Sequence, residues 1–431
     1  MFKTLKNAWK IPELRKKILI TMFIVVLYRF GAIIPVPYVD SSVMTGIFKS
    51  YEGSMFQYLN ILSGSAFSQA TLFALSISPY ITASIVIQLL SVAIPALERL
   101  SKQGEEGKKI LTQWTRIVTV ILGLVTAFGY YMAMRNGFGQ GVQVLTTRTT
   151  FSAIVIIACY VAGTALVMWL AEQINEHGIG NGISIILFAN ILAGALSIVD
   201  SFKNYIKNGP WGIVTVEVIV IVALAIITFV VFITESERRL PVQYAKKVVG
   251  RKMYGGQSTH LPIKLNMSGV MPIIFANSIV ALPATFELIF PPKTAFWRGF
   301  YKFFAPSGWF YAVLFAVLIV AFAYFYISIS FNPVEVSNNL KKNGGFIPGI
   351  RPGRPTSDYI TKVLNRIVLI GAFFLCAVAI IPMIANWISG GQLPSIIFGG
   401  SSLLIVVGVV LETAREIEGQ MTMRHYKGFL E

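Results

Sequence analysis

Charged residues are scarce in this chain and unevenly distributed. Only 13% of the 431 residues are Asp, Glu, Lys or Arg, and residues 53–97 contain none of them. Hydrophobic residues make up 55% of the chain and recur in charge-free runs along its whole length. Because a helix needs about 20 apolar residues to cross a bilayer, this pattern predicts a helical protein that spans a membrane several times.

Residue types that catalysis and metal binding need are scarce as well. The chain has three His and two Cys, and Cys159 and Cys376 each lie in an apolar run, so neither a metal cluster nor a disulfide framework is predicted. The sequence contains no G-x-x-x-x-G-K-[ST] phosphate loop, and we find no catalytic triad or zinc signature. We therefore expect no enzymatic activity and no cofactor, so any energy input must come from a partner.

Ten apolar runs are candidates for membrane spans. They lie at residues 18–36, 75–97, 117–134, 154–170, 183–199, 213–233, 270–290, 310–331, 367–384 and 396–411. Most Lys and Arg fall in alternate connecting segments, which the positive-inside rule assigns to the cytoplasm. Ten spans with both termini in the cytoplasm satisfy this rule. The net charge of +17 is then explained by short basic loops and does not call for DNA as a partner.

The charge-free window at 53–97 is too long for one span and leaves almost no turn for two. Two spans would also move the basic segment at 102–109, and every later loop, to the other side of the membrane. We therefore predict one span, preceded by a segment at 56–70 that enters the membrane from the outer face without crossing it. Such backbone is tolerated at membrane depth only where protein buries it or where it lines a watery cavity.

Counting the spans divides the chain into residues 1–202 and 213–431, joined by an external loop at 203–212. Five spans in each part place the two halves in opposite orientation, which is typical of inverted-repeat transporters and channels. Few ionisable residues lie in the spans: Arg29 in the first, and Glu217 and Glu287 near the outer ends of theirs. The absence of a carboxylate near the midplane disfavours proton-coupled transport.

Two segments predicted to lie in the cytoplasm are long and basic. Residues 234–268 alternate β-rich pieces with glycines, which predicts a protruding hairpin. Residues 332–361 use Pro and Gly to stiffen a loop that presents Arg351 and Arg354. The simpler interpretation of both segments is solvated positive charge on the cytoplasmic side. The more specific interpretation is a docking surface for a large acidic partner.

The amino end carries Phe2, Leu5 and Trp9 on one helical face and lysines elsewhere. This pattern is typical of a helix that lies on anionic membrane lipid, although a frayed tail explains it equally well. The segment lacks a short apolar core followed by a cleavage site, so we do not expect a removed signal peptide.

Six motifs give the chain a family resemblance. They are "RFGAIIPVP", "SPYITASIVIQLL", "EQINEHGIGNGISII", "YAKKVVGRKMYGGQSTHLPIKLN", "NPVEVSNNLKKNGGFIPGIRPGRPT" and "FGGSSLLIVVGVV". In this order they resemble, nearly end to end, the SecY family, whose members are central subunits of protein-conducting channels. The resemblance implies an all-α membrane protein with ten transmembrane helices in two inverted five-helix halves and a re-entrant plug half-helix. It also implies passage of unfolded secretory polypeptides across the bacterial cytoplasmic membrane and lateral release of hydrophobic segments into lipid.

The resemblance also implies roles for particular residues. The pore ring would be Ile77, Ile81, Ile183, Leu187, Ile274 and Ile405. The plug, about 56–70, would include Phe56, Leu59, Leu62, Ser63, Gly64 and Phe67. The lateral gate would be Thr82, Gln88, Asn277 and Leu282, and the partner-binding residues would be Arg251, Lys252 and Arg351.

Several of these assignments carry further expectations. By its spacing alone, the pair Ile77 and Ile81 is better explained as ordinary helix packing. Leu187 stands where isoleucine is common in the family, and the ring stays aliphatic. Leu282 replaces an aromatic residue often found there, which puts the strength of gate closure in doubt. Gln88 and Asn277 are expected to hydrogen-bond across a closed gate, unless such polar groups are ordinary interhelical contacts.

The partners that the resemblance implies are SecE, SecG, the motor ATPase SecA, the translating ribosome, secretory precursors and nascent membrane proteins. An inverted-repeat secondary transporter for a small solute is the alternative from another functional class. The missing midplane carboxylate and the basic cytoplasmic segments argue against it. An intramembrane enzyme lacks a catalytic constellation.

Overall fold

The computed structural model describes residues 8–49, 55–139, 142–208, 212–244, 247–249, 252–254, 258–290, 294–305, 308–388 and 400–427, and they are mostly helical. The helices of the first half are α2 (Pro12–Gly31), α3 (Ser41–Lys49), α4 (Met55–Leu62), α5 (Ser78–Ala93), α6 (Pro95–Lys102), α7 (Glu105–Arg135), α8 (Thr150–His177) and α9 (Gly182–Asn208). Those of the second half are α10 (Gly212–Glu235), α11 (Met271–Val280), α12 (Leu282–Ile289), α13 (Ala295–Phe303), α14 (Trp309–Ser330), α15 (Pro333–Lys342), α16 (Arg354–Ile388) and α17 (Gly400–Lys427).

Within the described residues, six helices or helical stretches are long and apolar enough to cross a membrane, or seven if α5 and α6 count as one bent span. The six are Glu105–Arg135, Thr150–His177, Val216–Glu235, Met271–Ile289, Trp309–Lys342 and Arg354–Ile384. All ten predicted apolar runs fall largely on a helix or a helix pair. The chain is therefore a mostly helical, multi-pass membrane protein, and the count of ten spans stays a prediction.

The run at 75–97, which the sequence predicts to be one span, is broken by a bend. The α5 helix begins at Ser78, and α6 turns away from it by 102°. Pro95 is the first residue of α6, and Ile94 before it is extended, with φ −106° and ψ 115°. Proline has no N–H and disfavours helical backbone in the preceding residue, so the bend follows from this one position.

The external loop is also shorter than the predicted 203–212. Residues up to Asn208 belong to α9, and α10 begins at Gly212, so helix replaces the first part of the expected loop.

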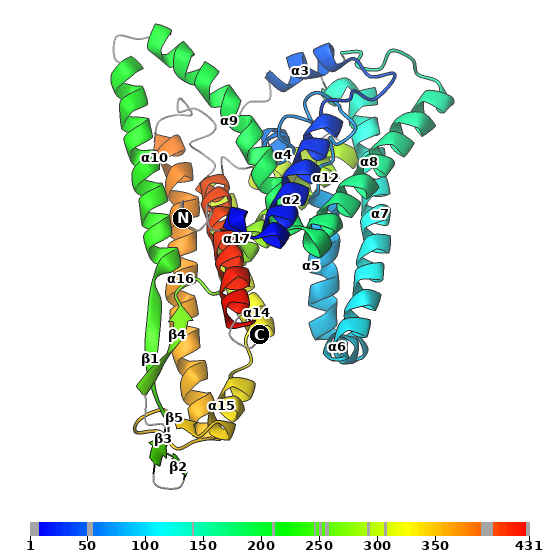
Figure 1. Cartoon of the computed structure of the whole chain (residues 1–431). Helices are drawn as coiled ribbons and strands as arrows, with labels where there is room; N and C mark the ends of the chain where they lie inside the picture. The colour runs from blue at the N-terminus through cyan, green and yellow to red at the C-terminus, as the bar shows by residue number, and fades with distance from the viewer. Residues whose placement is uncertain are drawn as a thin grey trace.

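The central core joins both halves of the chain. One buried apolar cluster contains Tyr28 of α2, Ile186 of α9, Phe315 of α14 and Leu375 of α16, among many others. Figure 1 shows α2, α5, α7 and α8 on the right and α10 and α16 on the left, with α17 between them. The two halves therefore meet along an apolar seam.

A small sheet extends from the helices. The strands β1 (Glu237–Tyr244) and β4 (Ser258–Lys264) form an antiparallel hairpin, with β2 (Lys247–Val249) and β3 (Lys252–Tyr254) paired near its tip. This confirms the predicted protruding hairpin. Its β1 strand also pairs with β5 (Gly345–Phe346), so both basic segments form one body at the lower end of Figure 1.

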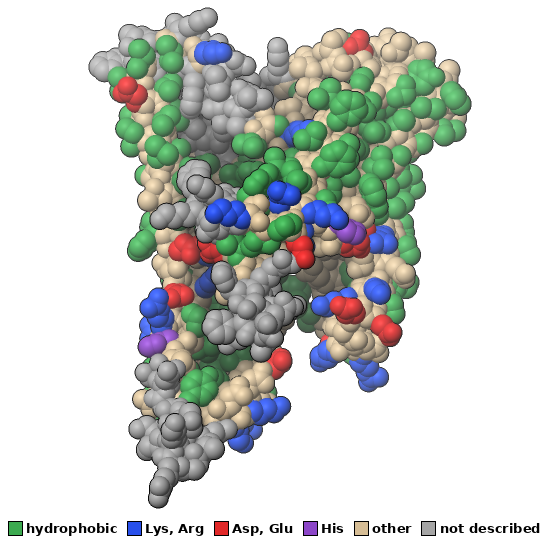
Figure 2. Space-filling view, viewed as in Figure 1, with side chains coloured by type: hydrophobic (Ala, Val, Ile, Leu, Met, Phe, Trp, Pro, Cys, Tyr) green, Lys and Arg blue, Asp and Glu red, His purple; other side chains and the backbone are tan. Residues whose placement is uncertain are grey.

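Charge is distributed along the long axis of the molecule. Figure 2 shows Lys and Arg over α6, over the sheet and over α15 at the lower end, whereas apolar side chains dominate the described upper half. This is the distribution that the positive-inside rule predicts if the lower end faces the cytoplasm.

Candidate functional site

A small cavity lies where four helices from both halves meet. It has a volume of about 40 Å³, and Ile81 of α5, Leu187 of α9, Ile274 of α11 and Ile405 of α17 line it. None of these four side chains is more than 3% exposed. Residues far apart in the sequence thus form one aliphatic constriction.

The other two predicted ring residues lie next to this cavity without lining it. Ile77, directly before α5, is one helical turn from Ile81, and Ile183 is one turn from Leu187. Both belong to the same buried cluster as the four lining residues. Six predicted ring positions therefore occupy adjacent layers of one apolar core.

The chemistry of the constriction follows from its side chains. Aliphatic groups offer no ligand to a dehydrated ion, so they exclude ions without binding them. A cavity of about 40 Å³ holds at most a few water molecules and has no room for a polypeptide. Among the described residues, the path is therefore closed at this constriction.

The segment at 56–70 covers the constriction from one side. Leu59 and Leu62 of α4 line the same cavity as the four ring residues. Phe56 and Phe67 pack in a second apolar cluster, where Phe67 stacks on Tyr130 of α7 at 4.5 Å between ring centroids. In Figure 1, α4 lies in the upper half, opposite to α6 and the hairpin.

Only the first part of this segment is helical. The α4 helix ends at Leu62, and turns continue to residue 77. Ser63 Oγ accepts a hydrogen bond from the Phe67 N–H at 3.0 Å, which closes the first of these turns. Gly64 and Ser65 have φ values of 63° and 71°, a left-handed backbone that ends a helix.

Three of the four predicted gate residues meet at the cavity. Thr82 of α5 and Asn277 and Leu282 of the opposite helices line it. The predicted hydrogen bond between Gln88 and Asn277 is wrong for this structure, because Gln88 Nε2 donates to Ser84 Oγ at 3.2 Å within α5. Gln88 lies more than one helical turn beyond Thr82 and does not reach the cavity.

Asn277 keeps an unusual environment. It is 3% exposed, and its Nδ2 and Oδ1 atoms have no hydrogen-bond partner among the described residues. An unpaired buried amide is costly, so this position favours any rearrangement that brings a polar group or water to it.

Two of the three predicted partner-binding residues, Lys252 and Arg351, lie at the lower end of the molecule, and Arg251 falls outside the described residues. Lys252 begins β3 at the hairpin tip. The side chain of Arg351 is exposed. Its backbone is held because Thr356 Oγ1 donates to the Arg351 carbonyl at 2.9 Å and Ser337 Oγ donates to the Gly353 carbonyl at 2.7 Å.

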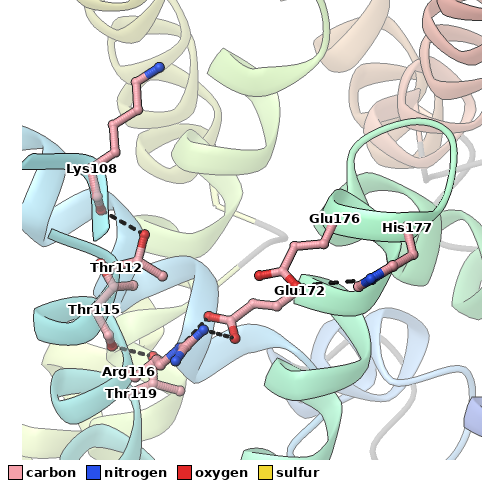
Figure 3. Close-up of polar contacts among 8 residues, drawn as sticks. All are labelled: Lys108, Thr112, Thr115, Arg116, Thr119, Glu172, Glu176 and His177. Atoms are coloured by element: carbon pink, nitrogen blue, oxygen red, sulfur yellow. Dashed lines mark hydrogen bonds and ion pairs between the residues drawn. The ribbon is translucent and has the colours of Figure 1, made fainter. Parts of the chain in front are cut away.

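Sequence reasoning gave no role to an ion pair between α7 and α8, shown in Figure 3. Arg116 holds Glu172 with two contacts of 2.9 Å, from Nε to Oε1 and from Nη2 to Oε2. The Glu172 side chain is only 8% exposed, whereas that of Arg116 is 46% exposed. The signal was available, because Glu172 opens the motif "EQINEHGIGNGISII".

Comparison with known proteins decides the family. The SecY family profile matches residues 71–414. Protein translocase subunit SecY of Streptomyces galbus is 42% identical over 440 residues, covering 100% of both chains. The chain belongs to the SecY family.

Two solved structures share the fold with this SecY-family chain. One belongs to a SecY protein whose plug domain is described as stabilising the closed state of the translocation channel and maintaining a membrane seal. It has a TM-score of 0.68 at 19% identity and covers 97% of both chains. The other is Sec61 in the canine ribosome-channel complex from the endoplasmic reticulum, with a TM-score of 0.64 at 18% identity over 94% of this chain and 92% of that one.

Membership of the SecY family sets the function. The chain is a subunit of a protein-conducting channel for translocation across a membrane, and it is not an enzyme. A secondary transporter for a small solute is thereby set aside.

Proposed function

We propose that polypeptides cross through the ring formed by the six predicted positions and that residues 56–70 seal it from outside. The observation that carries this proposal is the cavity at which Ile81, Leu187, Ile274 and Ile405 converge from four helices beneath Leu59 and Leu62. Flexible aliphatic side chains fit closely around an extended chain of any sequence while still excluding ions.

The proposed membrane arrangement has ten spans, in two inverted halves, with both termini in the cytoplasm of a bacterium. The positive-inside distribution of Lys and Arg supports it. The bent α5–α6 pair supports it as well, because one span over 75–97 keeps every later basic segment on the same side.

A lateral opening is proposed between α5 and α11–α12. Thr82 lines the ring cavity on one side of this seam, and Asn277 and Leu282 line it on the other. Since Asn277 has no hydrogen-bond partner among the described residues, the seam lacks the interhelical bond that the sequence predicts. A hydrophobic segment entering here would separate helices held mainly by apolar contacts, which lipid tails can replace.

The proposed partners are SecE, SecG, SecA, the ribosome and anionic lipid. One structural relative is described as part of a ribosome-channel complex, and the sheet with its exposed Arg351 offers a basic surface at the same end as α6. Since the sequence carries no phosphate loop, the motor must be a separate protein.

The experiment that tests this proposal measures precursor uptake. The chain is reconstituted with SecE and SecG in vesicles, SecA and a secretory precursor are added outside, and protease-protected precursor is measured with and without ATP. ATP-dependent protection that needs the signal sequence is expected. Absence of protected precursor in vesicles that contain correctly assembled complex would contradict the proposal.

A further inference from the structure

A buried polar cluster ties the plug segment to the two helices beside it. Arg29 of α2 and Asn190 of α9 meet at the carboxyl end of α4, and Ser76 joins them from the turn that precedes α5. Asn190 is fully buried, and Ser76 is 2% exposed. Because buried polar groups are costly unless they are hydrogen-bonded, each of these side chains favours the arrangement that keeps its partners in place.

Asn190 supplies a hydrogen-bond donor to the carboxyl end of α4. The last carbonyl groups of a helix have no partner within the helix. Asn190 Nδ2 donates to the Leu62 carbonyl oxygen at 2.7 Å, and Ser76 Oγ donates to the same oxygen at 3.2 Å. The amide also donates to Ser76 Oγ at 3.0 Å. One side chain of α9 therefore joins the end of α4 to the start of α5.

Arg29 completes the cluster. It donates to the Ala189 carbonyl and, at 3.2 Å, to Asn190 Oδ1. In the part of the chain that the structure describes, no carboxylate pairs with it, so its charge is met by these oxygens and by the carboxyl end of α4, where a cation is favoured.

Gly64 shows how closely the turn after α4 packs on this guanidinium. A Cβ at Gly64 would lie 2.9 Å from both terminal nitrogens of Arg29 and 3.0 Å from the Asn190 carbonyl oxygen. With φ at +63°, the position also favours glycine for its backbone. The end of the plug helix is thus seated on the cluster.

We propose that Arg29, Asn190 and Ser76 form a latch that holds the plug segment closed and releases it when the ring widens. The proposal rests on the proposed role of residues 56–70 as the plug. It adds the group that holds the plug and the event that frees it.

The coupling follows from shared backbone. Asn190 lies three residues after Leu187 on α9, and residues at this spacing share a helix face. Ser76 directly precedes Ile77. A translocating chain that moves α9 away from the start of α5 therefore stretches the bonds from Asn190 to Ser76 and to Leu62 together. Water in the opened path can then hydrogen-bond to Asn190, to Ser76 and to the Leu62 carbonyl, which have lost their partners.

The test measures how readily the plug segment leaves its seat. In a chain with Cys159 and Cys376 replaced by alanine, Ala66→Cys places a thiol in the segment at a position that is 2% exposed. A membrane-impermeant maleimide reports its exposure when it is added to intact vesicles whose outer surface carries the external face of the chain, the opposite orientation to that in the uptake experiment. We expect Asn190→Leu to raise the labelling rate roughly tenfold, because losing a hydrogen bond to a buried group shifts an equilibrium by about that factor.

Two further variants guard against a simple packing defect. Ser184→Ala removes a buried hydroxyl from the same helix that has no hydrogen-bond partner among the described residues, so labelling should not change. Ser76→Ala removes the second donor to the Leu62 carbonyl and one acceptor of Asn190, but it keeps the bond from Asn190 to Leu62, so a smaller rise is expected. If Asn190→Leu does not fold, unchanged labelling in Ser76→Ala overturns the latch.

Ion conductance separates failure of the latch from failure of the plug. A variant that lacks residues 56–70 should conduct ions at rest, and Asn190→Leu should conduct less than the deletion but more than the parent. A leaky deletion together with a tight Asn190→Leu variant and unchanged labelling would reject the latch and keep the plug. A deletion as tight as the parent would reject the plug, and the latch with it.

Discussion

At the residue scale, the constriction depends on what its side chains cannot do. Ile81, Leu187, Ile274 and Ile405 offer no oxygen to an ion, and they leave a cavity of about 40 Å³ among them. Charged or amide side chains there would recruit water and lower the barrier to ion passage. Because the seal depends on apolar contact, it can reform around a translocating chain of any sequence.

Replacing Ile81 or Ile274 with Asn should loosen the channel. An amide in the ring draws water into the constriction and lowers the barrier to opening. We expect precursors with defective signal sequences to be taken up more readily than by the parent. Ile81→Leu, which keeps the ring aliphatic, serves as the matched control. If the Asn variants only lose thermal stability, with unchanged signal selection, these residues are packing residues alone.

A second single-residue effect is expected at Arg351. Its exposed side chain sits on a loop whose glycines Gly349 and Gly353 have φ values of 81° and 106°, which holds the backbone in a tight turn. A docking arginine that binds a carboxylate with two nitrogens does not tolerate lysine, whereas a topological charge does. The loop geometry therefore favours recognition.

We expect Arg351→Glu, and to a lesser degree Arg351→Lys, to abolish motor-driven uptake while expression and topology stay normal. Arg351 would be buried only in the complex with its partner. Breaking one charged pair that is buried at an interface costs about 2 to 5 kcal/mol, which is roughly a thirtyfold to several-thousandfold loss of affinity. The loss of affinity is measured as binding of SecA to vesicles. Lys342→Glu, on the exposed end of α15, is the control because it makes an equal change of charge. If the Arg351→Glu variant binds SecA normally, Arg351 is only a solvated charge and does not contact the partner.

At the scale of elements, the sequence predicted the helices better than their ends. Apolar runs located the long helices because lipid requires about 20 apolar residues whatever the neighbours are. The bend between α5 and α6 was hidden inside the run at 75–97, where Pro95 was the available signal. The pairing of β1 with β5 joins Tyr244 to Gly345, and no local pattern specifies such a distant partner.

The ion pair between α7 and α8 gives a prediction at this scale. Arg116→Ala leaves the Glu172 carboxylate, whose side chain is 8% exposed, without the guanidinium that holds it. The loss should destabilise the packing of α7 on α8 by about 1.5 to 3 kcal/mol, the range for a hydrogen bond to a charged group. Thermal unfolding of the detergent-solubilised chain measures this. Glu172→Gln, which removes the charge and keeps the shape, should cost less, and equal unfolding temperatures for parent and Arg116→Ala would contradict the account.

At the scale of the whole molecule, the ring, the plug and the lateral seam share the same helices. Thr82 and Ile81 are neighbours on α5, and Asn277 and Ile274 lie three residues apart on α11, all around one cavity. Separating α5 from α11 would therefore open the ring and the path to lipid in one movement. The opening of the ring and the opening toward lipid would thus both result from separating the same two helices.

The site itself was predicted by family resemblance rather than by pattern. The spacing of Ile77 and Ile81 alone is that of ordinary packing, and only the fold shows Leu187, Ile274 and Ile405 around the same space. The bond between Arg29 and Asn190 joins residues 161 positions apart, so no local motif indicates it. Long-range polar contacts of this kind depend on how the helices pack, which the order of apolar runs does not determine.

The central claim is that a polypeptide crosses through the aliphatic ring, and cross-linking to a stalled precursor tests it most directly. Cysteines replace Ile81 or Ile274 in a chain without Cys159 and Cys376, and Phe373, which is 64% exposed on α16, is replaced in the control. A precursor arrested during uptake carries a single cysteine in its translocating part. We predict disulfide cross-links to both ring positions and none to position 373. Cross-links to position 373 that equal those to the ring, or no cross-links to the ring during active uptake, would contradict the account.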